Sequence, residues 1–200
     1  MNKIFLLLVM ILTITSGNSQ TDLEKLKIDS DISDLVKDIP TSEKRLDELY
    51  GLISYQTDEL QNYKFGDISL SKFKIPNGYA YGTNDLYVHV DNYTSNLFLG
   101  FTLNIVKEDE SKKLLVYLKK VYGNPEIRET GGNGISLFWN ATKSKQWIFL
   151  TQNKERTRKQ DVYLSTKVIV VKQGTRIENS KDSKIFTILD NFNMSYPKTK

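Results

Sequence analysis

The residue types that most often perform catalysis are scarce in this chain of 200 residues. It contains no cysteine and a single histidine, His89. Without a thiol, the protein has no disulfide bond, no thiol nucleophile and no thiolate metal ligand. A catalytic or metal-binding histidine needs partner side chains, and no motif in the sequence supplies them. We therefore expect His89 to be an ordinary surface or half-buried residue of a strand.

Carboxylates are the remaining candidates for acid–base chemistry. The chain has 24 aspartate and glutamate residues. A pair that cleaves a glycosidic bond must lie about 5–9.5 Å apart, a distance that sequence spacing does not define. The glycine-rich residues 130–134 lack the lysine and the following helix of a phosphate-binding loop. We assign no catalytic, cofactor-binding or metal-binding residue and no cofactor, and a carboxylate-based extracytoplasmic hydrolase stays open as the alternative to a non-enzyme.

Aromatic side chains on predicted strands are candidates for ligand contact. Tyr87, His89 and Phe98 belong to a sheet face that we expect to be partly exposed. Trp139 and Trp147 lie on two strands joined by a short polar turn, so they are either core residues or a platform for a sugar ring.

A basic segment offers a second candidate contact. Residues 153–161, NKERTRKQD, contain Lys154, Arg156, Arg158 and Lys159. One interpretation is a solvated hairpin loop, and the other is a site for a polyanion. No recognised nucleic-acid-binding module accompanies the segment, so we expect no nucleic acid as a partner.

The clearest element that must position these residues is a helix at residues 111–122. At about 100° per residue, its apolar side chains fall within an arc of about 160°. They are Leu114, Leu115, Tyr117, Leu118, Val121 and Tyr122. Ser111 can cap the first turn, and Gly123 and Pro125 end the helix. We expect the apolar arc to cover one face of a sheet.

Strands surround this helix. Apolar residues alternate at 86–91 and at 97–106, which predicts a hairpin, and further strands are predicted at 135–140, 146–152 and 162–171. The sequence therefore predicts an α+β fold in which a β-β-α-β-β-β core forms an antiparallel sheet covered by the helix.

Further helices are predicted towards both ends. The spacing of Ile32, Leu35, Val36 and Ile39 favours a helix that ends at Pro40. A second helix is predicted from Ser42 to about Ile53, with a strand that begins near Leu52 as the competing interpretation, and a short closing helix is predicted at about 182–191.

The first 20 residues are typical of a secretory signal peptide. Lys3 precedes an apolar run of about 11 residues, followed by small polar residues, and such a run is too short for the roughly 20 residues that cross a bilayer. We expect cleavage rather than retention as an anchor, a single α+β domain over residues 21–200, and a secreted or periplasmic product with no membrane span.

Charge is uneven along the expected domain. The net charge is −6 over residues 21–62 and +9 over residues 63–200. The two parts attract each other within one fold, are separately solvated, or form an acidic segment that covers a basic surface and competes with an anionic partner. Taken together, the sequence predicts a non-catalytic exported module that binds a protein or a component of the cell envelope. The hydrolase and a polyanion-binding protein that uses the segment 154–159 are the alternatives.

Overall fold

The computed structural model describes residues 20–79, 82–94, 96–130, 132 and 134–199. The predicted signal segment therefore lies outside the described residues except for Gln20. The strands are β1 (Thr21–Asp22), β2 (Lys44–Leu46), β3 (Ile53–Thr57), β4 (Tyr63–Phe65), β5 (Ile68–Ser69), β6 (Asp85–Val90), β7 (Phe98–Ile105), β8 (Glu126–Arg128), β9 (Ile135–Ala141), β10 (Gln146–Arg156) and β11 (Val162–Lys172). The α-helices are α1 (Ser33–Val36), α2 (Glu108–Tyr122) and α3 (Ile188–Ser195).

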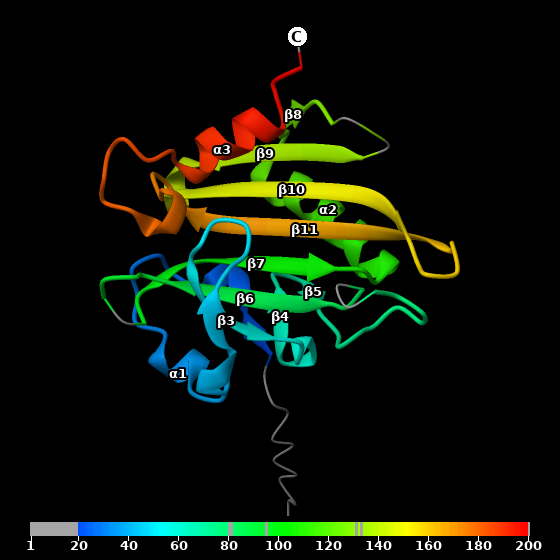
Figure 1. Ribbon diagram of the computed structural model, residues 1–200, viewed down its shortest axis with the longest axis horizontal. Helices are drawn as coiled ribbons and strands as arrows, with labels where there is room; N and C mark the ends of the chain where they lie inside the picture. The colour runs from blue at the N-terminus through cyan, green and yellow to red at the C-terminus, as the bar shows by residue number, and fades with distance from the viewer. Residues whose placement is uncertain (1–19, 80–81, 95, 131, 133, 200) are drawn as a thin grey trace, which may run out of the picture.

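One large sheet organises the molecule (Figure 1). Its eight strands follow the order β2-β3-β6-β7-β11-β10-β9-β8, and all neighbouring strands are antiparallel. A small mixed sheet, β1-β4-β5, accompanies it. The α+β class and the antiparallel sheet are confirmed. The expected β-β-α-β-β-β succession is not confirmed, since the short strand β8 follows α2 and two strands from the N-terminal third join the same sheet.

Helix α2 begins three residues earlier than predicted. Lys107 precedes its first turn, while Ser111 lies inside the helix and its hydroxyl donates to the backbone oxygen of Ile105 (3.3 Å). Gly123 closes the helix at a φ of +78°, a backbone conformation that favours glycine. Val121, which the sequence assigned to the apolar arc, is 47% exposed, so the buried surface of the helix is narrower than predicted.

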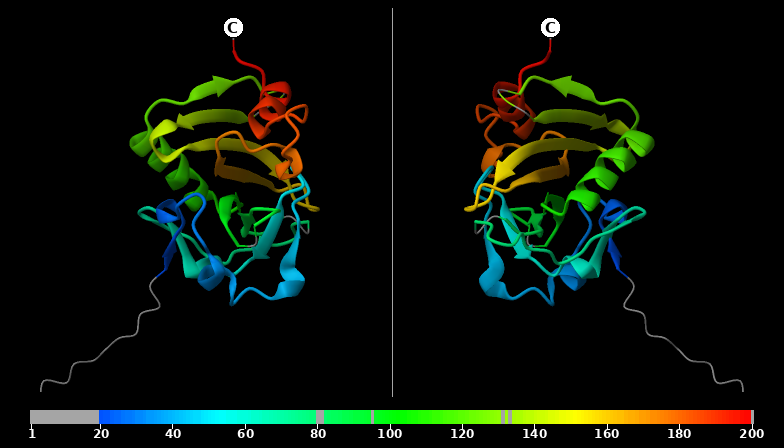
Figure 2. Two further views of the ribbon diagram at one scale, coloured as in Figure 1. Left: turned by 90° about the vertical axis from the view of Figure 1, so that its left-hand side faces the viewer. Right: turned by 90° about the vertical axis from the view of Figure 1, so that its right-hand side faces the viewer.

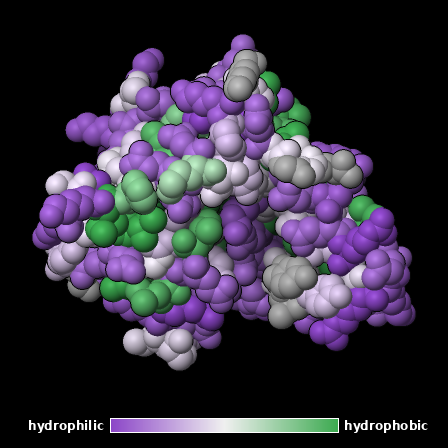
Figure 3. Space-filling model, turned by 45° about the horizontal axis from the view of Figure 1, so that its top comes forward, coloured by the Kyte–Doolittle hydropathy of each residue, from purple (hydrophilic) through white to green (hydrophobic). Residues whose placement is uncertain are grey.

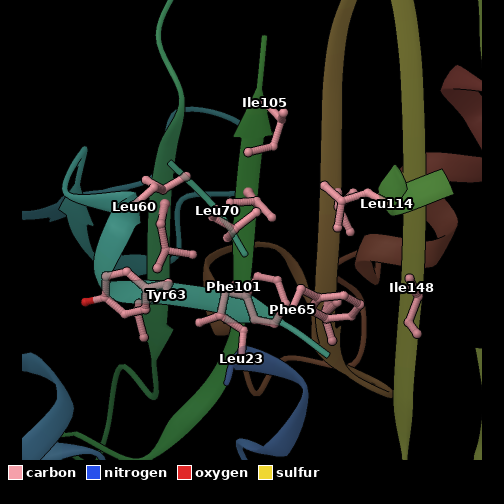
Figure 4. Packing of buried hydrophobic residues seen from close by; sticks show 14 of the residues in the cluster. Leu23, Leu60, Tyr63, Phe65, Leu70, Phe101, Ile105, Leu114 and Ile148 are labelled. Atoms are coloured by element: carbon pink, nitrogen blue, oxygen red, sulfur yellow. The ribbon is translucent and has the colours of Figure 1, made fainter. Parts of the chain in front are cut away.

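The two larger hydrophobic clusters lie on the two sides of the sheet, and a small third one contains Ile75, Val106 and Tyr163. The largest lies between the sheet, α2 and the N-terminal segments, and includes Leu118. Its members Leu114 and Phe101 are labelled in Figure 4. The second largest joins the opposite face to Phe192 of α3. Figure 2 shows α2 and α3 on opposite sides of the curved sheet. Each helix therefore covers part of one face.

The predicted helix from Ser42 is wrong. Its place is taken by β2, a turn and β3, so the competing strand near Leu52 is confirmed. The side chain of Asp47 accepts hydrogen bonds from the backbone N–H groups of Leu49 (2.9 Å), Tyr50 (3.1 Å) and Leu52 (3.2 Å). These bonds hold a turn in which Gly51 has a φ of +65°. Local turn chemistry thus overrides the apolar spacing.

The other terminal helices are shorter or displaced. Helix α1 keeps only one turn, preceded by Asp31, whose carboxylate accepts from the backbone N–H of Ser33 (2.7 Å). Helix α3 begins later than predicted, because Thr187 and Asp190 form a reciprocal capping box at its first turn. The chain then runs beside β8, where the N–H of Glu129 donates to the oxygen of Pro197 (2.9 Å) and Arg128 pairs with Lys198.

Candidate ligand-binding groove

A polar groove of about 860 Å³ lies on the sheet face opposite α2. The turn at residues 47–50 and helix α3 form its sides, and β6, β7, β11 and β10 form its floor. In Figure 3 the surface is hollowed near the middle of the view, with hydrophilic atoms in the recess. The strands contribute these lining residues: Gln56, Asp85, Tyr87, Thr102, Asn104, Phe149, Thr151, Asn153, Glu155, Ser165, Lys167 and Ile169.

Strand register places four polar residues in a row across this floor. Asp85 is paired with Asn104, Asn104 with Lys167, and Lys167 with Thr151. Directly paired residues of antiparallel strands point to the same face, so the four side chains lie together. In the next row along the strands, Ile169 and Phe149 lead into the hydrophobic cluster under α3. The groove therefore has a polar floor with an apolar margin.

Asp85 is held in place by two amide side chains. Nδ2 of Asn104 donates to its Oδ1 (2.6 Å), and Nε2 of Gln56 donates to its Oδ2 (3.1 Å). Burial raises the pKa of Asp85, while these hydrogen bonds and the charges of Lys167 and Arg45 act in the opposite direction. The carboxyl group is consequently a fixed acceptor in a partly desolvated position.

Tyr87 lies beside Asp85 on the same face. Burial, and after it the negative charge of Asp85, raises the pKa of Tyr87 to about 12. The phenol therefore keeps its proton at neutral pH and can donate a hydrogen bond into the groove. Lys167 adds a cation to the floor, so the site combines donors and acceptors of both charge signs.

The other carboxylates of the groove differ in availability. Asp47 is committed to the three backbone bonds of its own turn. Glu155 accepts a hydrogen bond from the hydroxyl of Tyr163 (2.8 Å). Glu48 is exposed at the rim. Among the described residues, no group of three or more His, Asp or Glu side chains could hold a metal ion.

His89 is fully buried, which corrects the expectation of a surface or half-buried residue. Its Nδ1 lies 2.6 Å from Oγ of Ser54 and its Nε2 lies 2.9 Å from Oγ1 of Thr102. Because Oγ of Ser54 donates to the oxygen of Leu52 (3.0 Å), it accepts from Nδ1, and Thr102 donates to Nε2. This chain satisfies a neutral imidazole, and burial lowers the pKa of His89 to about 4 against the opposing charge of Asp47.

The predicted aromatic contacts are not brought together. Tyr87 lines the groove, but Phe98 is fully buried in the cluster under α2. Trp139 is also buried there, and its Nε1 donates to the oxygen of Gly123 (2.8 Å). Trp147 pairs with Asn140, one position away from Trp139, and packs on the opposite face. The two tryptophans therefore form no common platform for a sugar.

The basic segment is part strand and part turn. Strand β10 continues to Arg156, so Lys154 and Arg156 lie on it, while Arg158 and Lys159 lie in the turn that follows. All four side chains are exposed, and none lines the groove. Arg158 lies over the ring of Tyr79 (5.4 Å) and Arg156 donates to the oxygen of Gln160 (3.0 Å).

Most residues of the floor were not predicted from the sequence. Gln56 and Lys167 come from β3 and β11, which are far in the chain from the consecutive strands β6 and β7 that carry Asp85 and Asn104. Two signals pointed here: Tyr87 was a predicted contact, and the alternation of residues 97–106 places Asn104 on the less apolar face. In comparisons with known proteins, no family model, no curated protein and no solved structure matches the chain. Within the described residues, no helix is long and apolar enough to cross a membrane.

Proposed function

We propose that this protein is an exported, non-catalytic module that binds a small polar ligand, or a polar group of a protein or envelope component, in the sheet-face groove. Export rests on the signal-like pattern of residues 1–20. The observation that carries the binding role is the prearranged Asp85, whose two oxygens are fixed by Asn104 and Gln56 at the floor of an open groove. A site that is already ordered loses less entropy when a ligand binds.

The polar groups define what such a ligand must carry. Tyr87 and Lys167 offer donors, Asp85 offers an acceptor, and Phe149 and Ile169 offer apolar contact at one side. A ligand with both an acid and a donor group, and with a small apolar part, matches this set. The commitment of Asp47 and Glu155 to internal hydrogen bonds favours binding over acid–base catalysis.

Thermal unfolding in the presence of chosen ligands tests this proposal. The probes are free amino acids and dipeptides, each at millimolar concentration. A ligand at 100 times its Kd stabilises the folded state by about 2.7 kcal/mol, or roughly 5–10 °C in Tm for a domain of this size. Lys167→Met should abolish the shift, whereas Lys113→Met, an exposed lysine on α2, should preserve it. Equal shifts in both variants would place the ligand elsewhere, and no shift with any probe would refute this ligand class.

A carboxylate-based hydrolase is the second candidate, and one observation favours it. The raised pKa of Asp85 in an open groove is a property of general acids. Hydrolysis of chromogenic glycosides by the wild type, abolished by Asp85→Asn, would support this function. Binding of a probe without turnover of any glycoside would support the binding module.

A further inference from the structure

A second groove, of about 1010 Å³, lies on another part of the surface. Residues 24–29, the last turn of α2, the turn between β9 and β10, and Lys172 line it. We call it the basic groove because five lysines contribute to it against two acids. The lysines are Lys25, Lys27, Lys143, Lys145 and Lys172, and the acids are Glu24 and Asp29.

Both acids of the basic groove are engaged by the protein itself. The carboxylate of Glu24 accepts hydrogen bonds from the hydroxyls of Tyr117 (2.6 Å) and Tyr122 (2.9 Å). Asp29 forms an ion pair with Lys172, with 2.8 Å between Nζ and each carboxylate oxygen. Glu24 keeps its negative charge, but within the described residues neither acid forms an ion pair with Lys27, Lys143 or Lys145.

Three of the lysines have no such partner. Lys27, Lys143 and Lys145 are exposed, and none forms an ion pair with a residue that the structure describes. Their backbones are nevertheless fixed. The N–H of Lys145 donates to the oxygen of Thr142 (3.2 Å), its own oxygen accepts from Gln173 (2.9 Å), and the oxygen of Lys27 accepts from the N–H of Ser30 (3.1 Å). The groove thus presents unpaired ammonium groups on anchored turns.

We propose that the basic groove binds an anionic polysaccharide that carries carboxylate or sulfate groups. An ammonium group is a point charge that does not require the paired geometry of an arginine contact. Leu26, Ile28 and Val121 between the lysines supply apolar surface for the sugar rings. A hollowed groove fits a chain-like ligand better than the flat surface of a bilayer. A single-stranded nucleic acid needs stacking aromatic rings, and here Tyr122 is tied to Glu24.

This site differs from the basic segment at 154–159 and does not depend on the function proposed for the sheet-face groove. The segment at 154–159 has comparable charge, but its four basic side chains line neither of the two grooves. We therefore propose the basic groove, rather than residues 154–159, as the site for a polyanion.

The test compares three triple variants that each lower the net charge from +4 to +1. The first is Lys27→Gln/Lys143→Gln/Lys145→Gln in the basic groove. The second is Lys154→Gln/Arg156→Gln/Arg158→Gln in the basic segment. The third is Lys74→Gln/Lys113→Gln/Lys184→Gln, which removes three exposed lysines that are distant from one another in the chain. Binding to dextran sulfate is measured by titration at several salt concentrations.

We expect only the first variant to lose affinity strongly, by at least tenfold. The slope of log affinity against log salt concentration should also become shallower by about 2, because three contacts with a single-stranded polyanion are lost. Equal losses in all three variants would show a net-charge effect and overturn the proposal, and so would a loss confined to the second variant. Wild-type binding that is tighter to single-stranded DNA or to anionic vesicles would also overturn it. Equal Tm values for the three variants would exclude unfolding as the cause of any loss.

Discussion

Strands β6, β7 and β11 present different side chains on the two faces of the sheet. On the face under α2 they contribute a row made of Val88, Phe101 and Val170. On the other face, the neighbouring row is made of Tyr87, Thr102 and Ile169. The first row is closed over by a helix and contains only apolar side chains. The second borders a groove in which polar side chains are held by one another. A single set of strands thus supplies a closed core on one side, and both a smaller core and a polar groove on the other. We therefore expect substitutions on the two sides to differ in their effect on stability and in how that effect depends on pH.

The largest loss of stability is expected where α3 packs on the groove face. Phe192→Ala removes a ring that packs against Phe138, Phe149 and Tyr196, with the guanidinium of Arg128 at 5.8 Å. We expect a loss of about 3–5 kcal/mol in the free energy of unfolding, the usual cost of such a truncation. Urea denaturation measures it. A loss below about 1 kcal/mol would show that α3 contributes little to the groove face.

The matching change under α2 is Leu118→Ala. Leu118 is fully buried between the helix and the sheet, so we expect a loss of about 2–5 kcal/mol. Val116→Ala, on the same helix at a position that is 67% exposed, is the control and should change stability by less than about 0.5 kcal/mol. Similar losses for both helix variants would contradict the packing of α2 described above.

The imidazole of His89 should make stability depend on pH. The folded-state pKa of His89 is about 4, whereas in the unfolded chain it is close to 6.5. The unfolded state therefore binds the proton first, and stability is full above pH 6.5 and falls as the pH drops towards 4, by about 3 kcal/mol in total. Denaturation at pH 7 and pH 4.5 measures this loss, and His89→Gln should reduce it.

The single histidine gives a direct check of that assignment. Its ring proton resonances can be followed by NMR without any other imidazole in the chain. An apparent pKa near 6.5 in the folded protein would contradict the buried, hydrogen-bonded neutral ring.

The smallest effect concerns the floor of the groove. Asn104→Ala removes one of the two hydrogen bonds to Asp85 and should cost about 1–3 kcal/mol at neutral pH. That bond lowers the pKa of Asp85, so its loss raises the pKa further and penalises only the ionised form. The loss of stability caused by Asn104→Ala should therefore shrink as the pH falls and Asp85 becomes protonated. Urea denaturation of wild type and variant between pH 7 and pH 4 compares them, and a cost that is independent of pH would contradict this role.

The elements that could be predicted are those with local signals. The apolar arc and the glycine stop of α2, and the alternation of β6 and β7, are encoded within single segments. The turn at residues 47–52 was missed because Leu46, Leu49, Tyr50 and Ile53 have helical spacing, and only the hydrogen bonds of Asp47 show that the chain reverses there.

The groove could not be predicted for a different reason. Asp85, Asn104, Lys167 and Thr151 meet through the register of four strands, and one-residue shifts would send each of them to the other face. The burial of His89 likewise depends on Ser54 of β3, a strand whose pairing with β6 is not visible in the sequence. Alternation tells which residues share a strand face, but not which strands are neighbours.

The segment that follows α3 covers one border of the large sheet. A strand at the border of a sheet exposes unpaired N–H and C=O groups, on which another chain can add a strand. At the β8 border, Pro197 and Lys198 already occupy this position. At the opposite border, β2 is three residues long and carries Lys44 and Arg45, which repel an identical neighbour. A truncated chain that ends at Tyr196 should therefore lose more solubility than stability, because the truncation exposes β8 to pairing with another molecule.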